Sequence, residues 1–355
     1  MDASYRAQEA RDIPTVNLAP FLGSPDQPQP GSSRSRAGRA LVEALHGLGF
    51  AQVIGHGVSQ REIDEALGWA KALFDLPYHH KMKAPHPPGP IPHRGYSGLG
   101  KEKVYSQADV EARADGVDVG QSLRKISDFK ESYEIGSELD PVQQNIWLPP
   151  DILPGFRPAM TALYEKLCRV GEMVLHAIGV GLGLDGAALA ALTKLMSDRS
   201  CQLRLLHYPA IAKEKLENEM LARLPAHHDW GTFTMLFQDK GGGLELRDPV
   251  TQAFLKAPPQ QGAFVLNVGD MLQRFSNDYF TSALHRVSVP DPSTVDPLGI
   301  PPRHSIPFFV CPDFSHTVST LPGFVAETSP AKYEPVRFDQ YGAVISRYQY
   351  QGDGS

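Results

Sequence analysis

One short segment, AHHDWG at residues 226–231, carries two histidines and an aspartate side by side. It leads into a β-prone apolar run at 232–236, so an extended backbone is expected here. In an extended chain, side chains two positions apart share a face, which places His227 beside Asp229 and turns His228 away. One imidazole and one carboxylate then form two-thirds of a metal site that needs one more nitrogen.

The third donor is predicted to be His285, in the segment SALHRV at 282–287. This position is late enough in the chain to lie on a neighbouring strand. Two histidines and one carboxylate on one face of an octahedral ion leave three positions open, as in non-haem Fe(II) oxygenases that bind a cosubstrate and O2 together. A zinc hydrolase more often keeps a single open position. The open face favours redox chemistry.

A second pattern follows the histidine in the chain, at Arg303-His-Ser305. An extended backbone sends the arginine and the serine to the same face, where a guanidinium fork and a hydroxyl can grip a carboxylate. The competing interpretation is an ordinary surface arginine on a strand. The position after the HRV segment favours the carboxylate site.

Composition limits the class of protein. The chain has 355 residues, of which 41% are hydrophobic and 21% charged, enough for one large domain or two closely joined ones. A net charge of -6 and a pI near 6.1 argue against a nucleic-acid or anionic-membrane partner. Three scattered cysteines without a CxxC motif, no apolar leader and no long apolar run predict a cytoplasmic protein that is neither secreted nor membrane-spanning.

Helical periodicity precedes strand periodicity along the chain. Apolar spacing predicts helices at 37–48, after Ser59 and, longest of all, from Phe156 to about Gly181. Short period-two segments separated by turns then predict a barrel or double-sheet jelly roll rather than alternating β-α-β units. These predicted strands are 202–208, 231–238, 243–247, 263–268, 283–289 and 305–310.

The predicted fold is therefore mainly β with flanking helices. It has a double-stranded β-helix core of the jelly-roll or cupin-like kind, an N-terminal α/β region and a long central helix. The proline-rich run 84–96 excludes helix and inner strand, and the polar stretch to 128 extends it into a long loop that is either a lid or mobile. The predicted regions are an N-terminal part with this loop at 1–150, the jelly-roll core at 151–348 and a tail at 349–355.

The ordered motifs resemble the 2-oxoglutarate- and Fe(II)-dependent oxygenases of the isopenicillin N synthase-like group, from about residue 13 to about residue 348. A single H-x-D would be weak support, whereas the same triplet followed by HRV and R-x-S is specific. The matching pieces are IPTVNL (13–18), GFAQVIGHGV (49–58), RGY (94–96), DFKE (128–131), YP (208–209), H-x-D-x-G (227–231), N-x-GD (267–270), SA-x-HRV (282–287) and R-x-S (303–305).

The resemblance implies a set of site residues and cofactors. His227, Asp229 and His285 would bind Fe(II), and Arg303 and Ser305 would bind the far carboxylate of 2-oxoglutarate with help from Tyr208. Trp230 and Phe233, which flank the metal motif, are candidates for the substrate pocket. The cofactors implied are Fe(II), 2-oxoglutarate and O2, with ascorbate as a possible reductant.

The implied reaction is oxidative decarboxylation of 2-oxoglutarate to succinate and CO2, coupled to oxidation of a small organic molecule. The outcome would be hydroxylation, desaturation or ring formation, and the proline and aromatic content of the chain is compatible with a mostly apolar substrate from secondary metabolism. No sequence feature names this substrate or fixes the oligomeric state.

Two departures from the family pattern stand out. Leu206 occupies a position where relatives commonly have asparagine, which removes one polar contact beside Tyr208. The interval between His285 and Arg303 is also long and proline-rich, as a longer hairpin loop would accommodate.

Three alternatives remain open on sequence grounds. The chain could be an isopenicillin N synthase-like oxidase that does not use 2-oxoglutarate, with the R-x-S pair gripping a substrate carboxylate. It could be a catalytically silent small-molecule binding module on the same fold. A zinc hydrolase on a cupin-like barrel is the third.

Overall fold

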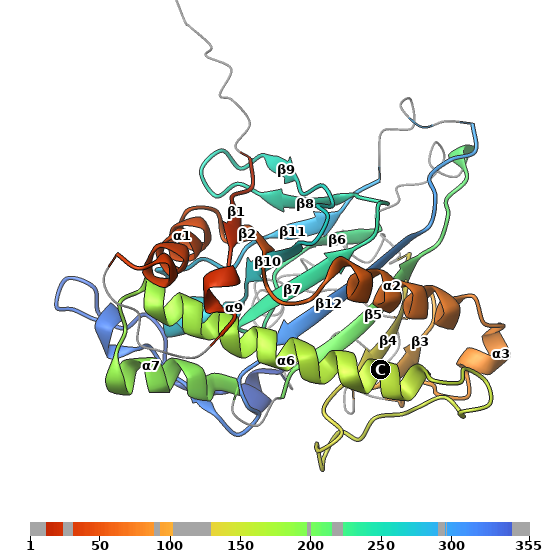
Figure 1. Ribbon diagram of the computed structural model, residues 1–355, viewed down its shortest axis with the longest axis horizontal. Coiled ribbons are helices and arrows are strands. Elements are labelled where there is room, and N and C mark those ends of the chain that lie inside the picture. Colours follow the sequence, from red (N-terminus) through yellow and green to blue (C-terminus); the bar gives the residue numbers. More distant parts are fainter. Residues whose placement is uncertain are drawn as a thin grey trace, which may run out of the picture.

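The computed structural model describes residues 12–23, 31–88, 93–101, 129–196, 200–214, 223–289, 295 and 297–342. Two β-sheets form its centre, and helices cover one side (Figure 1). The large sheet has eight strands in the order β1-β2-β10-β7-β12-β5-β4-β3, and the small sheet has four in the order β6-β11-β8-β9. Leu206 and Tyr208 of the large sheet pack against Leu224 and Val287 of the small one, so the sheets share a core.

The strands are short and mostly antiparallel. In the large sheet they are β1 (Thr15–Asn17), β2 (Phe50–Ile54), β3 (Gly95–Ser97), β4 (Glu131–Ile135), β5 (Gln202–Tyr208), β7 (Phe233–Gln238), β10 (Phe264–Val268) and β12 (Arg303–Val310). In the small sheet they are β6 (Leu224–His227), β8 (Leu244–Arg247), β9 (Phe254–Lys256) and β11 (His285–Val287). A separate pair joins β13 (Thr317–Val318) and β14 (Val336–Arg337).

Helix α6 lies along the large sheet with α1 beside it (Figure 1). The two helices approach closely because Gly38 and Gly181 meet at their crossing: a Cβ on Gly38 would lie 2.8 Å from the Ala177 carbonyl oxygen. The helices are α1 (Ser33–Leu48), α2 (Gln60–Phe74), α3 (Tyr78–Lys81), α6 (Phe156–Gly181), α7 (Gly186–Thr193) and α9 (Asp270–Phe275), with 3-10 turns η1 (Ala19–Phe21), η2 (Lys194–Met196) and η4 (Pro322–Phe324).

The predicted mainly β jelly-roll core with flanking helices is confirmed. Among the strands that escaped the sequence prediction, β6 and β4 did so for identifiable reasons. Strand β6 contains Pro225, which argues against an inner strand, and it lies at the edge of the small sheet, where a missing N–H is tolerated. Strand β4 carries Glu131 and Glu134, which are buried in ion pairs and so disguise an inner strand as a polar segment.

Most of the predicted lid, residues 89–92 and 102–128, lies outside the described residues. Strands from both sides of residue 150 share the large sheet, because β1 to β4 join it with β5, β7, β10 and β12. The division of the chain at this residue stays a prediction. None of the described helices is long and apolar enough to cross a membrane.

Candidate functional site

Three side chains converge between the two sheets. His227 ends β6, and β11 pairs with β6 so that His285 stands directly opposite it. Asp229 Oδ1 lies 3.7 Å from His227 Nε2 and 3.8 Å from His285 Nε2. In the part of the chain that the structure describes, this is the one group of three or more histidine, cysteine or acidic residues whose donor atoms all lie within 4.8 Å of one another.

Each of these side chains is oriented by a hydrogen bond made through its other polar atom. His227 Nδ1 contacts the Pro225 carbonyl oxygen at 2.9 Å, and His285 Nδ1 contacts that of Ala283 at 3.0 Å. With Nδ1 as the donor, each Nε2 keeps its lone pair for a metal. The other carboxylate oxygen, Oδ2 of Asp229, is bound by two donors: the Thr234 hydroxyl at 2.5 Å and the Asn267 amide at 2.7 Å.

The protonation states also suit a cation. Burial, followed by the charge of His285, lowers the pKa of His227 to about 3, so its imidazole is neutral near pH 7. Burial opposes ionisation of Asp229, but the nearby imidazoles and the two hydrogen bonds hold the pKa of this carboxyl below its usual value. Imidazole nitrogens together with one carboxylate fit a divalent ion with open positions.

Asp229 lies in the loop after β6, where an extended backbone continuous with the following strand was expected. This loop is fastened to the turn before α9. The Asp270 N–H donates to the Asp229 carbonyl oxygen at 2.8 Å, and the Gly269 N–H donates to that of Thr232 at 3.0 Å. A Cβ on Gly269 would lie 2.3 Å from the Gly231 carbonyl oxygen, so this turn needs glycine. The loop thereby fixes the carboxylate that an extended strand was expected to fix.

The three side chains open into a cavity along strands β5 and β12. Alternate residues of each strand face it, as the pleat requires. From β5 these are Gln202, Arg204, Leu206 and Tyr208, and from β12 they are Arg303, Ser305, Pro307 and Phe309. Because the strands are antiparallel with Arg303 opposite Tyr208 and Phe309 opposite Gln202, the cavity has two distinct ends.

At one end the structure brings together Arg303, Ser305 and Tyr208. The Arg303 side chain is completely buried, and its Nη1 donates to the Ser305 hydroxyl oxygen at 2.9 Å. Its Nη2 donates to Gln238 Oε1 at 3.2 Å, and its Cζ lies 5.0 Å from the centre of the Tyr208 ring. These partners are all uncharged.

Arg303 therefore carries a buried charge without a carboxylate at ion-pair distance among the described residues. Burial lowers the pKa of its guanidinium, although Tyr208 and Asp239 act in the opposite direction. A second buried guanidinium, that of Arg223, lies near enough for Arg303 to add to the effect of burial and lower its pKa to about 10. This end of the cavity is suited to an anion.

Of the two aromatic candidates for the substrate pocket, only Trp230 lines the cavity. Trp230 is half-buried, lines the cavity and stacks on Phe338 with ring centres 5.8 Å apart. Phe233 is fully buried in the main hydrophobic core, where its strand pairs with β10 and β12, and it is not among the cavity residues. The expected substrate contact by Phe233 is therefore corrected to a core contact.

Sequence reasoning missed the other end of the cavity. Arg204 and Gln202 were seen only as part of a predicted strand. Counting back from Tyr208 in steps of two would have found both, because the same strand face carries all of them. Of the two hydrogen-bond donors to the Asp229 carboxylate, Asn267 lies in the N-x-GD motif, whereas Thr234 lies in the predicted strand 231–238 and had no other signal.

Comparison with known proteins decides the family. The model of the 2OG-Fe(II) oxygenase superfamily matches residues 200–312, and that of the non-haem dioxygenase in morphine synthesis N-terminal region matches residues 13–154. A 2-oxoglutarate-Fe(II) type oxidoreductase of Metarhizium rileyi, ppzD, is 36% identical over 97% of this chain and 93% of its own. The chain belongs to the 2-oxoglutarate-Fe(II) oxygenase superfamily. It is an oxidoreductase of the dioxygenase type, and its family uses Fe(II), 2-oxoglutarate and O2.

Two further relatives place this oxygenase among characterised proteins. The proline hydroxylase buaE of Petromyces alliaceus is 36% identical over 82% of this chain and 86% of its own. The crystal structure of a full-length Neurospora crassa protein in complex with alpha-KG matches with a TM-score of 0.79 and 30% identity, covering 93% of this chain and 94% of the other.

Proposed function

We propose that His227, Asp229 and His285 hold the Fe(II) of this dioxygenase and that Arg303, Ser305 and Tyr208 bind the far carboxylate of 2-oxoglutarate. The proposal is supported most directly by the buried Arg303, whose described partners are all neutral. A guanidinium in such a place calls for an anion that enters from outside the chain. The direction of Nε2 and Oδ1 toward one point supports the metal assignment.

Bound Fe(II) would supply the activation of O2 that couples decarboxylation of 2-oxoglutarate to oxidation of the substrate. The protein's own residues position the metal ligands and the cosubstrate and exclude water from the site. Thr234 and Asn267 keep Asp229 ionised and turned toward the histidines. Ser305 and Tyr208 hold the guanidinium fork against the cavity. Leu206, Leu224 and Val287 pack between the sheets beside this end and keep water from it.

The substrate is proposed to be a small organic molecule, with release of succinate and CO2. Relatives carry names such as proline hydroxylase, and the same Neurospora crassa protein has also been crystallised with alpha-KG and thymine. Several relatives are fungal dioxygenases of the kind found in secondary metabolism, which we propose for this chain as well. Hydroxylation, desaturation and ring formation are all compatible with the site.

The test is an anaerobic visible spectrum of the metal-free protein as Fe(II) and then 2-oxoglutarate are added. We expect a charge-transfer band that needs both additions, is absent in Asp229→Ala and is weakened in Arg303→Ala. Arg61→Ala is the matched control, because Arg61 is an exposed arginine paired with Glu65 on helix α2.

Two other outcomes would refute the proposal. Tight iron binding without a band would favour an oxidase that does not use 2-oxoglutarate. Absence of iron binding would favour a binding module.

A further inference from the structure

The end of the cavity away from Arg303 has its own polar wall. Phe309 is six positions beyond Arg303 on β12, which corresponds to roughly 20 Å along an extended strand. Opposite Phe309 stands Gln202, and Arg204 follows on the same face of β5. If Arg303 binds the cosubstrate, as proposed above, this second end is left for the substrate.

Arg204 is held by a carboxylate that is itself buried. Strand β4 pairs with β5 so that Glu134 stands opposite Arg204, and the Arg204 Nε forms an ion pair with Glu134 Oε1. The side chain of Glu134 is completely buried, and its second oxygen accepts a hydrogen bond from the Gln202 amide. The guanidinium carbon of Arg204 lies 5.7 Å from the centre of the Phe309 ring. Both the charge and the direction of Arg204 are therefore fixed.

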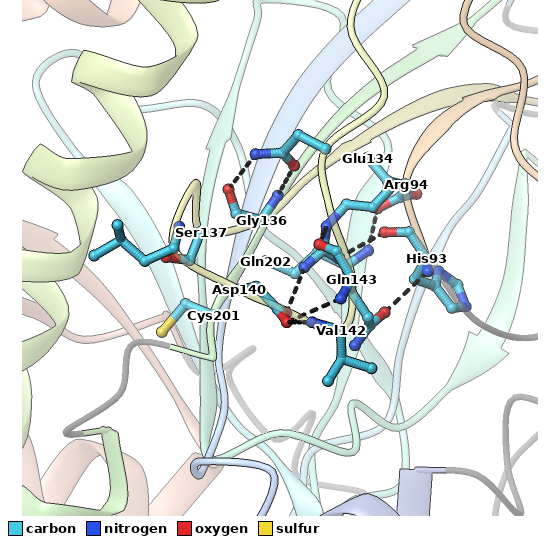
Figure 2. A network of polar contacts seen from close by, with 12 residues as sticks. His93, Arg94, Glu134, Gly136, Ser137, Asp140, Val142, Gln143, Cys201 and Gln202 are labelled. Carbon is cyan, nitrogen blue, oxygen red and sulfur yellow. Dashed lines mark hydrogen bonds and ion pairs between the residues drawn. The ribbon is translucent and has the colours of Figure 1, made fainter.

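The buried Arg94 supports another residue of the cavity, His93, and Figure 2 shows its contacts. Arg94 donates to the carbonyl oxygen of His93 at 2.7 Å and to that of Gln143 at 3.2 Å, and it lies 3.4 Å from Asp140. The His93 N–H in turn donates a hydrogen bond to the Gln143 side-chain oxygen at 3.0 Å. A Cβ on Gly136 would lie 1.9 Å from Arg94 Nη2, so a side chain at this position would displace the guanidinium. His93, which lines the cavity, is thus held from its backbone.

Charge separates the two ends. At the far end Arg204 is paired with the carboxylate of Glu134, and Arg94, which holds His93, lies at ion-pair distance from Asp140. At the near end Arg303 has neutral partners. Lys130 also lines the cavity there, because Glu131 pairs with His207 and the preceding residue is level with Tyr208. A balanced guanidinium still donates hydrogen bonds, but it gains less from a second anion than an unbalanced one does.

We propose that Arg204, beside Phe309, binds a neutral carbonyl oxygen of the substrate, such as that of an amide, lactam or imide. Arg204 is then a substrate-binding residue, while Glu134 and Arg94 are positioning residues. A carboxylate substrate would instead leave a net negative charge buried beside Glu134, which is unfavourable. The proposal names the substrate class of the function proposed above and rests on it.

The test uses two matched probes, phenylacetamide and phenylacetate, which differ only in the neutral or charged end of the molecule. Their dissociation constants are measured by NMR titration of the protein loaded with 2-oxoglutarate and Zn(II), which binds the same ligands without paramagnetic broadening. We expect phenylacetamide to bind wild type about tenfold more tightly than phenylacetate, and Arg204→Met to weaken phenylacetamide by about tenfold. Glu134→Gln should shift the preference toward phenylacetate by about tenfold, because it leaves the guanidinium unbalanced.

Arg204→Met leaves Glu134 buried without its arginine and can unfold. The double variant Arg204→Met/Glu134→Gln removes both charges and provides the same test of phenylacetamide binding. Unchanged phenylacetamide affinity in it, tighter binding of phenylacetate to wild type, or no binding of phenylacetamide to wild type would each overturn the proposal. The Fe(II) and 2-oxoglutarate band is recorded in parallel: its absence in wild type refutes the proposed function, whereas its presence with unchanged probe affinities refutes only the role of Arg204.

Discussion

The two ends of the cavity use the same residue type in opposite ways. Arg303 and Arg204 both point inward from adjacent antiparallel strands, and both are shielded from solvent. Arg303 is surrounded by a hydroxyl, an amide and a phenol ring, whereas Arg204 is paired with Glu134. The partner of such an arginine, rather than the arginine itself, therefore indicates the charge of the ligand that binds there.

The largest expected effect is on the stability of the ligand-free protein, which should depend on Arg204 but not on Arg303. Arg204→Met should lower the free energy of unfolding by about 3–5 kcal/mol, because it strands the buried carboxylate of Glu134. Arg303→Met should leave the free energy of unfolding unchanged or raise it, since it removes a charge that has no ion-pair partner. Urea denaturation of the metal-free variants measures both. Equal losses would erase the distinction between the two ends.

The affinity for 2-oxoglutarate should depend on Arg303 and not on Arg204, the reverse of the order expected for stability. Arg303→Met is expected to weaken 2-oxoglutarate binding by about 2–5 kcal/mol, or roughly 30-fold to several thousand-fold, because the carboxylate loses its charged partner. Arg204→Met/Glu134→Gln, which removes one ion pair from the far end without changing its net charge, should change this affinity by less than about threefold. Anaerobic titration of the Fe(II)-loaded protein gives both values. A large loss in the double variant would place the cosubstrate at the wrong end.

Metal affinity should depend on Thr234, which orients the Asp229 carboxylate. Thr234→Val removes the hydroxyl donor to Asp229 Oδ2 and is expected to weaken Fe(II) binding by about 10–100-fold. Thr232→Val is the matched control, because Thr232 is buried in the same loop and its hydroxyl oxygen has no hydrogen-bond partner among the described residues. Metal competition with a chromophoric chelator measures the affinities. Similar losses in both variants would mean that loop packing, not the hydrogen bond, orients Asp229.

The stability of the fold should fall in acid because of His56, which lies outside the cavity. His56 is buried, accepts a hydrogen bond from the Val58 N–H at 3.2 Å and contacts the Gly262 carbonyl oxygen at 3.0 Å. Burial lowers its pKa to about 4 from the usual 6.5, so between these values the unfolded chain binds a proton that the folded protein excludes. The contribution to stability is present above pH 6.5 and is lost as the pH falls toward 4.

At pH 5 this loss amounts to about 2 kcal/mol relative to pH 7. His56→Gln should therefore show a weaker decline in the free energy of unfolding between pH 7 and pH 5, measured by urea denaturation at each pH. An unchanged slope would show that other groups carry the acid sensitivity. The preference for phenylacetamide over phenylacetate should stay the same in this variant, because His56 does not line the cavity.

Sequence patterns predicted the parts of the site that depend on strand alternation and family motifs. His227, His285, Arg303 and Ser305 lie at strand positions with a fixed facing, so their convergence followed from period two. Asp229 converges for another reason, since backbone hydrogen bonds from Gly269 and Asp270 shape its loop. Such contacts join residues far apart in sequence and leave no local pattern.

The fold was predictable to a similar depth. Helix α6 and strand β5 follow from apolar periodicity, and both have the predicted bounds. Strand β4 was hidden because its glutamates resemble a solvated segment, and only their partners Lys81 and Arg204 reveal that they are buried. Tertiary ion pairs of this kind override the rule that charge lies outside.

The alternation of side chains along β5 and β12 also bears on how such an enzyme diversifies. Positions 303 and 305 lie two or more pleat repeats along β12 from position 309, yet all three belong to the same face of this strand. Substitutions at 202, 204 and 309 can alter what is recognised at the far end without moving the backbone that carries the near end. A lineage can therefore inherit its oxidising machinery intact while exchanging the molecule on which that machinery acts.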